Sequence, residues 1–337
     1  MHAAVLERFG DARALSWGEA PDPVARPGWV TVELRAAALN WHDVLVRQGR
    51  YDSPLPHVIG ADGAGIATDS GQEVVILPSL AWGDDESAPG ADWEILGDHR
   101  PGSYAEYVSV PSECVHPKPS GLDWHQAAGL PLVGVTAYRA LVSRGGLRAG
   151  ESVLISGAGG GVAPMAVAVA VGVGARAIVT SSSAAKIELA VRGGAEGGVL
   201  YTDPGWPEQA KQFTAGGRGF DVVLDTVGTW AESLQALRPG GRLVVLGASR
   251  AETATVEARP FYFGQYSILG TTMGSVADFR GLLGLLESGA VPPPLIDSVF
   301  PLSEASAAHE RLEAGGAFGK IILDIDSAHI DSAGGTA

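Results

Sequence analysis

Apolar and polar residues alternate in short runs along the first 120 residues of the chain. Two of these runs are Trp29–Arg35 (WVTVELR) and Gln72–Leu77 (QEVVIL). Gly, Pro and Asp residues, which favour turns, separate the runs at short intervals. Alternation with a period of two is typical of strands that bury one face. Many short strands separated by turns predict a β-rich domain of barrel type.

A different pattern follows, in which continuous apolar runs alternate with helix-like stretches. In chain order the runs are Val153–Ser156, Ala175–Thr180, Val199–Tyr201, Phe220–Asp225, Arg242–Gly247 and Ile268–Gly270. Uninterrupted apolar strands are typical of parallel sheets that are covered on both faces. Strands that alternate with helices predict an α/β fold with a doubly wound parallel sheet. The segment Leu237–Gly241 (LRPGG) predicts a turn before the fifth run.

The pattern changes again after Gly270. It predicts a helix over Val276–Ser288 and strands over Val299–Leu302 and Lys320–Asp324. We expect these elements to return to the first domain, which makes that domain discontinuous. The predicted domains are residues 1–127 with 270–337, and residues 128–269.

A glycine-rich loop joins the first strand of the α/β region to its helix. It follows the pattern Gly157-x-x-Gly160-x-x-Ala163, which departs from the common Gly-x-Gly-x-x-Gly. Glycines let the backbone approach a ligand closely, and a helix that begins here directs N–H groups and a positive dipole end toward that ligand. The loop therefore predicts a pyrophosphate site. A plain tight turn, with no ligand, is the alternative interpretation.

The end of the second strand bears on the choice of dinucleotide. NAD sites usually place Asp or Glu there, which bonds the ribose 2′-hydroxyl. This chain has Thr180–Ser183 and then Lys186, with no acid in that stretch. Hydroxyls and a lysine favour a 2′-phosphate and therefore NADPH. A second, compatible interpretation is that Ser183 caps a helix over Ala184–Arg192 while Lys186 is solvated.

Composition narrows the functional classes. The 337-residue chain has a net charge of −15 and no basic run, which argues against nucleic acid and anionic membranes as partners. Its single cysteine, Cys114, cannot form an internal disulfide, which fits a reducing cytoplasm. The N-terminal residues predict a first strand and not a signal peptide. The acidic, turn-rich segment Ser79–Arg100 predicts an extended lobe or loop.

Several short motifs occur in a characteristic order. They are Ala38–Asp43 (ALNWHD), Gly60–Gly65 (GADGAG), Gly102–Tyr107 (GSYAEY), Ala127–Pro131 (AAGLP), Thr136–Tyr138 (TAY), the glycine-rich loop, Pro239–Gly241 (PGG) and Phe318–Lys320 (FGK). Through them the chain resembles the medium-chain dehydrogenase/reductase superfamily over nearly its whole length. The resemblance implies a GroES-like β-barrel domain split around a Rossmann dinucleotide-binding domain, with the active site in the cleft between them.

The same resemblance identifies where the chain departs from zinc alcohol dehydrogenases. Those enzymes place a zinc-binding Cys where this chain has Asn40, and a zinc-binding His where it has Ala61. Their structural zinc uses four cysteines in the segment that corresponds to Ser79–Arg100, which here contains none. We therefore expect no metal site, and the pattern instead resembles the zinc-free quinone oxidoreductase and enoyl reductase branch.

The resemblance also implies the site residues. Asn40 is expected beside the nicotinamide, and Tyr51, at the place of a proton-donating tyrosine in enoyl reductases, is expected to act with it in catalysis. Two alternatives stay open: Tyr51 as an aromatic pocket wall, and His42 as the proton donor or as a packing residue. The expected cofactor-binding residues are Asn40, Thr136, Gly157, Gly160, Gly161, Val162, Ser181, Ser182, Lys186, Tyr201, Gly228, Gly247 and Lys320.

These features together predict an NADPH-dependent reductase that transfers hydride to a quinone or an α,β-unsaturated carbonyl without zinc. Such small-molecule acceptors spread the added charge along a conjugated system, so they need less help from a Lewis acid. The alternatives are a zinc-independent alcohol or aldehyde dehydrogenase-like enzyme, and a non-catalytic NADPH-binding sensor. The family further implies a homodimer that pairs edge strands of the cofactor domains.

Overall fold

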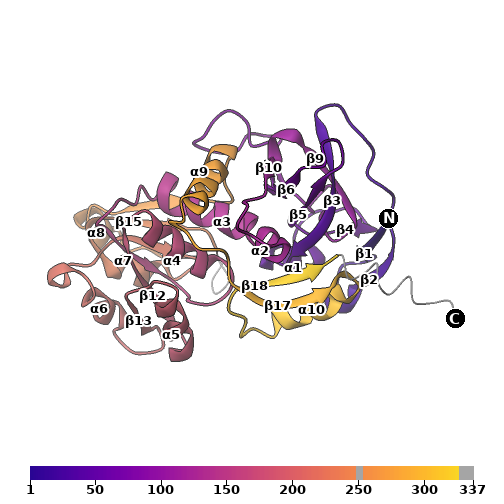
Figure 1. Cartoon of the computed structure of the whole chain (residues 1–337). Coiled ribbons are helices and arrows are strands. Elements are labelled where there is room, and N and C mark those ends of the chain that lie inside the picture. The colour runs from indigo at the N-terminus through magenta and orange to yellow at the C-terminus, as the bar shows by residue number, and fades with distance from the viewer. Residues whose placement is uncertain (248–252, 326–337) are drawn as a thin grey trace. The chain divides into compact units, whose positions relative to one another are not determined.

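The computed structural model describes residues 1–247 and 253–325 (Figure 1). Backbone contacts divide the chain into two units. Unit 1 comprises Met1–Val133, Ser275–Phe279 and the residues from Pro293 onward, and unit 2 comprises Gly134–Gly274 and Arg280–Pro292. Among the residues described, no helix combines the length and the apolar character needed to cross a membrane.

Unit 1 is built mainly on antiparallel strands. Its largest sheet has the order β10-β6-β5-β3-β18-β17, with β9 paired to β3, and two smaller sheets have the orders β2-β1-β4 and β7-β8. The strands are β1 (His2–Leu6), β2 (Leu15–Glu19), β3 (Trp29–Ala38), β4 (His57–Val58), β5 (Asp62–Ala67), β6 (Glu73–Ile76), β7 (Ser79–Leu80), β8 (Glu94–Ile95), β9 (Tyr107–Pro111), β10 (Val115–Pro117), β17 (Ile296–Pro301) and β18 (Lys320–Asp324). The α-helices wholly within unit 1 are α1 (Trp41–Arg47), α2 (Trp124–Gly129) and α10 (Ala305–Glu313).

The alternation that predicts β3 corresponds to burial of one face of this strand. Val32, Leu34 and Ala36 are buried, whereas Glu33 and Arg35, which lie between them, are only partly buried. Because successive side chains of a strand point to opposite faces, the apolar set fills the core of unit 1. The predicted β-rich region is therefore confirmed.

Unit 2 contains the predicted doubly wound sheet. Among the described residues its six strands are parallel and have the order β13-β12-β11-β14-β15-β16, so the chain starts at the centre, runs to one edge, and then returns to the other side. The strands are β11 (Ser152–Ile155), β12 (Arg176–Ser181), β13 (Gly197–Leu200), β14 (Phe220–Asp225), β15 (Leu237–Val245) and β16 (Ser267–Gly270). The helices are α3 (Pro131–Tyr138), a π-helical turn (Arg139–Arg144), α4 (Val162–Gly172), α5 (Ala184–Arg192), α6 (Trp206–Lys211), α7 (Trp230–Ala236), α8 (Ala258–Phe263) and α9 (Val276–Glu287), of which α3 and α9 each have residues in both units.

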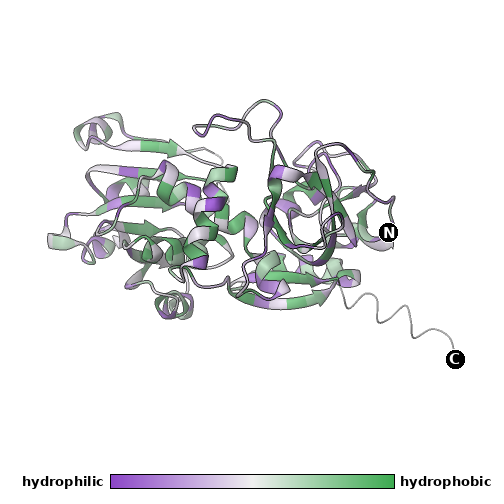
Figure 2. Ribbon diagram, turned by 45° about the horizontal axis from the view of Figure 1, so that its top comes forward, coloured by the Kyte–Doolittle hydropathy of each residue, from purple (hydrophilic) through white to green (hydrophobic). Residues whose placement is uncertain are grey.

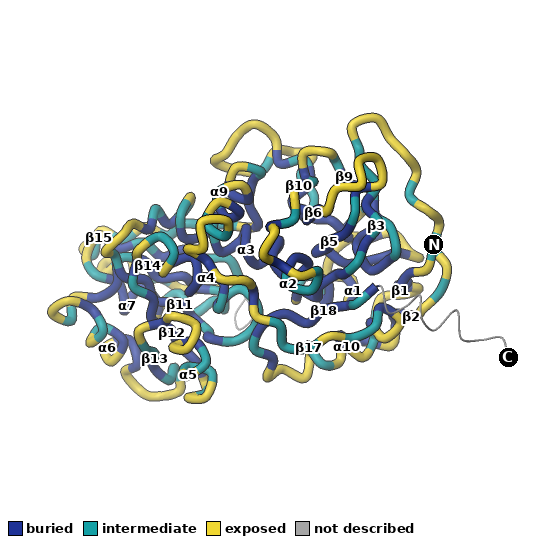
Figure 3. The backbone as a smooth tube through the Cα atoms, in the orientation of Figure 1, coloured by how far each residue is buried: buried dark blue, intermediate teal, exposed yellow. Residues whose placement is uncertain are grey.

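The core of unit 2 lies along its central strands. All four residues of β11 are buried, as are the apolar residues of β14 (Figure 3). The strands of this sheet are largely hydrophobic, as expected for strands covered on both faces (Figure 2). Ala166, Val169 and Ala170 of α4 are fully buried, because their small side chains let the helix pack closely.

One predicted element of unit 2 is wrong in detail. The turn predicted over Leu237–Gly241 belongs to β15. Leu237 pairs with Phe220, and the ladder resumes where Arg242 pairs with Val222, so the residues between them form an irregularity inside the strand. Gly240 allows it because its φ is 74°, in the left-handed region. The turn-forming residues therefore interrupt the strand without ending it.

Candidate functional site

The glycine-rich loop of unit 2 lies at the carboxyl end of β11, where the strand order of the sheet reverses. The N–H of Ser156 donates to the carbonyl of Leu224 in β14 (2.9 Å), and the N–H of Ala158 donates to the carbonyl of Thr180 in β12 (2.7 Å). The loop is thus fixed to both strands that flank β11. Open α/β sheets bind their ligands at such switch points.

Gly160 and Gly161 lead from this loop into helix α4. Gly160 has a φ of 74°, which favours glycine, and a Cβ built on it would meet no atom within 4 Å. Gly161 is the N-cap of α4, Val162 is its first residue, and no side chain caps the N–H groups of this helix start. An anion can therefore approach the backbone closely and be stabilised by these N–H groups and by the helix dipole.

The ammonium of Lys186, in α5, lies beside the glycine-rich loop. A Cβ built on Gly159 would be 3.0 Å from Lys186 Nζ. Within residues 1–247 and 253–325, no hydrogen bond or ion pair engages this ammonium. Ser181 ends β12, and its carbonyl accepts the N–H of Tyr201 (3.0 Å), while Ser182 is exposed just after it. A cation without a partner beside an uncapped helix start is an environment suited to an anion.

The other predicted cofactor residues of unit 2 have structural partners. The N–H of Gly228 donates to Asp225 Oδ1 (2.8 Å). A Cβ on Gly247 would lie 2.3 Å from the carbonyl oxygen of Thr226, so only glycine fits there. Thr136, in α3, is buried. Gly228 and Gly247 therefore shape the backbone that follows β14 and β15, whereas Thr136 packs within a helix.

In unit 1, Asn40, Asp62 and Lys320 form a buried polar triad. Lys320 Nζ donates to Asn40 Oδ1 (2.5 Å) and to Asp62 Oδ2 (2.9 Å), and Asn40 Nδ2 donates to the same Asp62 oxygen (3.0 Å). Asp62 Oδ1 accepts the N–H of Leu132 (2.7 Å). The three residues are 5%, 0% and 3% exposed, so the ammonium and the carboxylate neutralise each other in the core.

Strand pairing brings the triad together from distant parts of the chain. Ala38, the last residue of β3, pairs with Asp62 on one side and with Ile322 on the other. Asn40 lies two residues after Ala38, and Lys320 lies two residues before Ile322. The triad is therefore a product of sheet register and not of any local motif.

Asp43 links Asn40 to a second buried network. Asp43 Oδ2 accepts the backbone N–H of Asn40 (2.8 Å) and the hydroxyl of Tyr104 (3.0 Å). Tyr104 Oη also lies 3.3 Å from His309 Nε2. Burial raises the pKa of Asp43 to about 6 and lowers the pKa of His309 to about 3. A neutral His309 that donates Nε2–H to Tyr104 completes a chain of hydrogen bonds that ends on the Asp43 carboxylate.

His42, the second residue of α1, is held by Asp98. Its Nε2 lies 2.5 Å from Asp98 Oδ1, and the two side chains are 11% and 8% exposed. Burial disfavours the charged imidazole, but the hydrogen bond to Asp98 and its negative charge outweigh that effect, so the pKa of His42 is raised. The ring of Tyr51 packs edge-on against His42, with 4.7 Å between ring centroids. Burial, followed by the Asp98 charge, raises the pKa of Tyr51.

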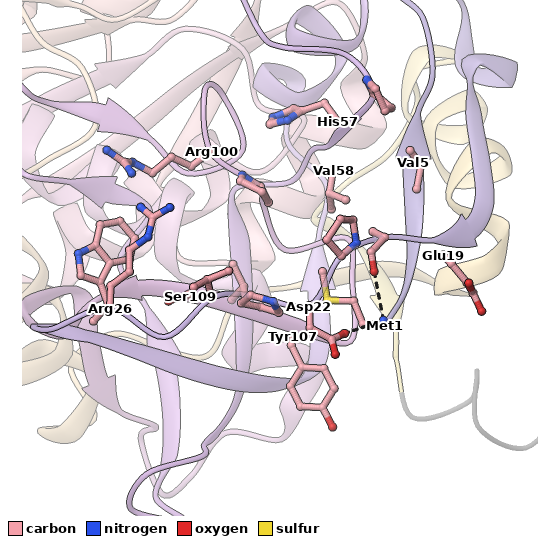
Figure 4. Close-up of a pocket in the computed structure, with 18 of the residues that line it drawn as sticks. Met1, Val5, Glu19, Asp22, Arg26, His57, Val58, Arg100, Tyr107 and Ser109 are labelled. Atoms are coloured by element: carbon pink, nitrogen blue, oxygen red, sulfur yellow. Dashed lines mark hydrogen bonds and ion pairs between the residues drawn. The ribbon is translucent and has the colours of Figure 1, made fainter.

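Unit 1 also contains a cavity of about 380 Å³ (Figure 4). Arg26 and Arg100 line it, and their guanidinium carbons lie 5.4 and 5.1 Å from the ring centroid of Trp29, another lining residue. The Met1 ammonium closes part of the wall through its bond to Asp22 (2.7 Å). Asn40, Tyr51 and Lys320 are not among the residues that line this cavity. It is therefore separate from the site residues predicted for unit 1.

The residues at the positions of family zinc ligands do not fit a zinc ion. Ala61 has no side-chain atom that can bind a metal, and Asn40 Oδ1 and Asp62 Oδ2 already accept hydrogen bonds from the Lys320 ammonium. A cation placed there would be repelled by that ammonium. In the part of the chain that the structure describes, no group of three or more His, Cys, Asp or Glu side chains is arranged to hold a metal.

The predicted site residues do not include Asp98 and Asp62, two of the acids in these networks. Asp98 is one of several acids in Ser79–Arg100, and nothing local distinguishes it from the others. Asp62 carries a usable signal, because it is a charged residue among small apolar ones in Gly60–Gly65. Such a residue needs a buried partner. The partner, Lys320, could not be identified without the register of β18.

Comparison with known protein families supports the division into two kinds of domain. Residues 26–120 match the alcohol dehydrogenase GroES-like domain. Residues 161–288 match the zinc-binding dehydrogenase family. The first range lies in unit 1. The second range contains strands β12 to β16 of the parallel sheet, which follow the glycine-rich loop in sequence.

Individual relatives are similar over nearly the whole chain. A probable quinone oxidoreductase of Schizosaccharomyces pombe is 31% identical over 320 residues, which cover 90% of this chain and 91% of that protein. An NADPH-dependent alkenal/one oxidoreductase of Arabidopsis thaliana is 33% identical over 307 residues, which cover 89% and 73%. A crystal structure of an NAD-dependent alcohol dehydrogenase superimposes with a TM-score of 0.90 at 38% identity, covering 96% of this chain and 100% of that one.

Proposed function

Because this chain belongs to the medium-chain dehydrogenase/reductase superfamily, in its quinone oxidoreductase-like branch, we propose that it is an NADPH-dependent reductase. It transfers hydride to a quinone or an α,β-unsaturated carbonyl and uses no zinc. The observation that carries the proposal is the Lys186 ammonium, which lies beside the glycine-rich loop without a partner among the described residues. The NADPH-dependent alkenal/one oxidoreductase among the relatives supports the same chemistry.

Unit 2 binds the cofactor in this proposal. NADPH supplies the hydride when it is bound. The N–H groups at Gly160, Gly161 and Val162 hold the pyrophosphate, because they begin a helix and have no side-chain cap. The 2′-phosphate and adenosine are held by Ser181, Ser182, Lys186 and Tyr201, and the rest of the cofactor is lined by Thr136, Gly157, Gly228 and Gly247.

Unit 1 provides the acceptor side of the reaction in this proposal. Lys320 and Asp62 hold the Asn40 amide by both its oxygen and its nitrogen, so this side chain is fixed. Asn40 is the residue proposed beside the nicotinamide. Tyr51, 36% exposed, lines the acceptor site. A conjugated acceptor delocalises the charge that hydride transfer creates, which removes the need for a metal to polarise its carbonyl.

The decisive experiment is to measure coenzyme binding and turnover together. We expect NADPH oxidation with quinones and enals, and we expect it to survive treatment with a chelator. Lys186→Ala is expected to weaken NADPH binding by about 10- to 100-fold, the effect of one charge-assisted hydrogen bond, while NADH binding stays unchanged.

Lys211→Ala is the matched control, because Lys211 pairs with Glu208 (2.6 Å) on α6 and is not a predicted cofactor residue. NADPH affinity that is equal in wild type and Lys186→Ala contradicts the proposed phosphate site. One tightly bound zinc per chain contradicts the metal-free reaction.

A second candidate function is a zinc-independent alcohol or aldehyde dehydrogenase-like activity. The structural neighbour at 38% identity, an NAD-dependent alcohol dehydrogenase, is the observation that favours it. Simple aldehydes and NADH, tested in the same assay, distinguish the two functions by rate. Binding of NADPH with no turnover of any acceptor would instead indicate a sensor.

We also propose a homodimer that forms through unit 2. Strand β16 ends the sheet and pairs only with β15 among the described strands. Next to it in sequence, Tyr262 and Phe263 of α8 are 55% and 65% exposed. Unpaired strand edges and exposed aromatic residues favour association. Light scattering tests the mass in solution. For the compartment we keep the prediction of a reducing cytoplasm, which rests on the single cysteine, Cys114, and the internal disulfide that it cannot form.

A further inference from the structure

We propose that His42, held by Asp98, supplies the proton that completes the proposed reduction. This inference rests on the proposed function, because the proton is needed only if an acceptor takes up hydride. It adds a catalytic residue, His42, and a positioning residue, Asp98, to the site. It also assigns Tyr51 to the wall of the acceptor site instead of to acid catalysis.

The first argument is the orientation of the imidazole. Asp98 Oδ1 lies 2.5 Å from Nε2, so this nitrogen is committed to the carboxylate. In residues 1–247 and 253–325, no hydrogen bond engages the other ring nitrogen, Nδ1. A carboxylate at one ring nitrogen fixes the ring and stabilises its charged form. His42 can therefore present a proton on Nδ1.

The second argument is the set of charges that face the two candidate donors. His42 faces Asp98 from the segment after β8, and Asp43 from its own helix also favours the imidazolium. Among the described residues, the one aromatic ring that packs against the His42 imidazole is that of Tyr51. The same Asp98 charge disfavours ionisation of Tyr51, which makes the phenol a poorer acid. The negative charge of Asp98 thus increases the fraction of His42 that carries a proton near neutral pH. Tyr51 is already protonated there, so the same charge only weakens it as an acid.

The chemistry balances with an enone as acceptor. The enone takes up hydride at its β-carbon, and the C=C electrons move to oxygen to give an enolate. The Nδ1–H bond of His42 breaks as a C–H bond forms at the α-carbon, which leaves a neutral imidazole. NADPH is the two-electron reductant, and solvent returns a proton to His42, whose side chain is 11% exposed.

The test is the pH dependence of kcat/KM for NADPH oxidation with one active enal. We expect the wild-type rate to fall as pH rises through the pKa of His42, because only the imidazolium donates. Asp98→Asn moves this fall to lower pH. His42→Gln lowers kcat by about 10²- to 10⁴-fold, the usual contribution of a general acid. Tyr51→Phe changes KM but leaves the fall at the wild-type pH.

His125→Gln is the control, since His125 also lies near a carboxylate, Asp324 (3.8 Å), but is not a predicted site residue. It is expected to keep the wild-type profile. A second measurement, the titration of His42 by nuclear magnetic resonance, needs no substrate. The imidazole should titrate above 6.5 in the wild type and lower in Asp98→Asn.

Each outcome has one meaning. Wild-type kcat in His42→Gln, a loss of 10²-fold or more in Tyr51→Phe, or a His42 titration that ignores Asp98→Asn overturns the role of His42 and leaves the proposed function intact. Failure of the wild-type chain to oxidise NADPH with any acceptor overturns the proposed function, and the role of His42 with it.

Discussion

Lys186 in unit 2 and Lys320 in unit 1 both occupy predicted cofactor positions, but their electrostatic environments are opposite. Lys186 is partly exposed, and its ammonium has no partner among the residues that the structure describes. Lys320 is 3% exposed and is bonded to both Asn40 and Asp62. A cation without a partner can bind a ligand. A buried cation such as Lys320 already donates its hydrogen bonds to other residues of the protein, so it stabilises the fold. The comparison assigns Lys186 to ligand binding and Lys320 to the stability of the fold, and mutations can test that assignment.

The largest expected effect follows from Lys320→Met. The variant leaves the Asp62 carboxylate, 0% exposed, with hydrogen bonds but no opposite charge. Removing one partner of a buried ion pair destabilises proteins by about 3–5 kcal/mol. We expect a loss of that size in the free energy of unfolding, measured with urea on the full chain.

Two further variants separate charge from packing at this site. Lys320→Met with Asp62→Asn removes both charges and should regain part of the lost stability. Lys211→Met breaks an ion pair whose partner, Glu208, has a side chain that is 72% exposed, and should change stability by less than about 1 kcal/mol. If Lys320→Met were as mild as Lys211→Met, the triad would not support the fold.

The next effect concerns the protonation of His309, which costs stability as pH falls below 6.5. The pKa of His309 is about 3 in the folded chain, below its ordinary value of 6.5. A His with a lowered folded pKa contributes stability that is present above pH 6.5 and is lost as pH falls, because the unfolded state takes up the proton first. Between pH 7 and pH 4 this loss is about 3 kcal/mol.

His309→Leu should remove that acid-dependent loss. The variant is expected to be less stable than wild type at pH 7, because Tyr104 loses a hydrogen-bond partner. Its deficit should shrink or reverse by pH 4, by about 3 kcal/mol relative to wild type. A deficit that stays constant from pH 7 to pH 4, in denaturation curves at both pH values, would mean that His309 is not held neutral by burial.

The difference between the loop of unit 2 and the buried triad of unit 1 also explains which parts of the structure the sequence could predict. The strand, loop and helix around Gly160 are neighbours in sequence, so local glycine and apolar patterns predict them. The triad joins residues 40, 62 and 320, and the His42–Asp98 pair spans 56 positions. Those contacts depend on the register of β3 with β5 and β18, and on the path of Ser79–Arg100. Alternation of residue types carries neither kind of information.

A third prediction compares two glycines of unit 2 that have nearly the same positive φ. Gly160 and Gly205 have φ values of 74° and 72°, and a Cβ on either would meet no atom within 4 Å. Alanine in this conformation costs about 1 kcal/mol, so both substitutions should lower stability equally. Only Gly160→Ala is expected to weaken NADPH binding in calorimetry, by about 10-fold or more, because its Cβ would occupy the space of the pyrophosphate. Equal NADPH affinity in the two variants would remove the loop from the binding site.

The smallest expected effect compares two helix starts. Ser183 is the N-cap of α5 but its side chain makes no cap hydrogen bond, whereas Asp123, the N-cap of α2, accepts the N–H of Gln126 (2.8 Å). Losing a working N-cap costs about 1 kcal/mol. We therefore expect Asp123→Ala to lower the free energy of unfolding by about that amount, and Ser183→Ala to change it by less than about 0.5 kcal/mol. The hydroxyl of Ser183 would then be available to a phosphate, so Ser183→Ala should still weaken NADPH binding a few-fold. Equal losses of stability in both variants would instead show that Ser183 is a structural cap. Phosphate binding would then depend on Lys186 and not on the Ser183 hydroxyl.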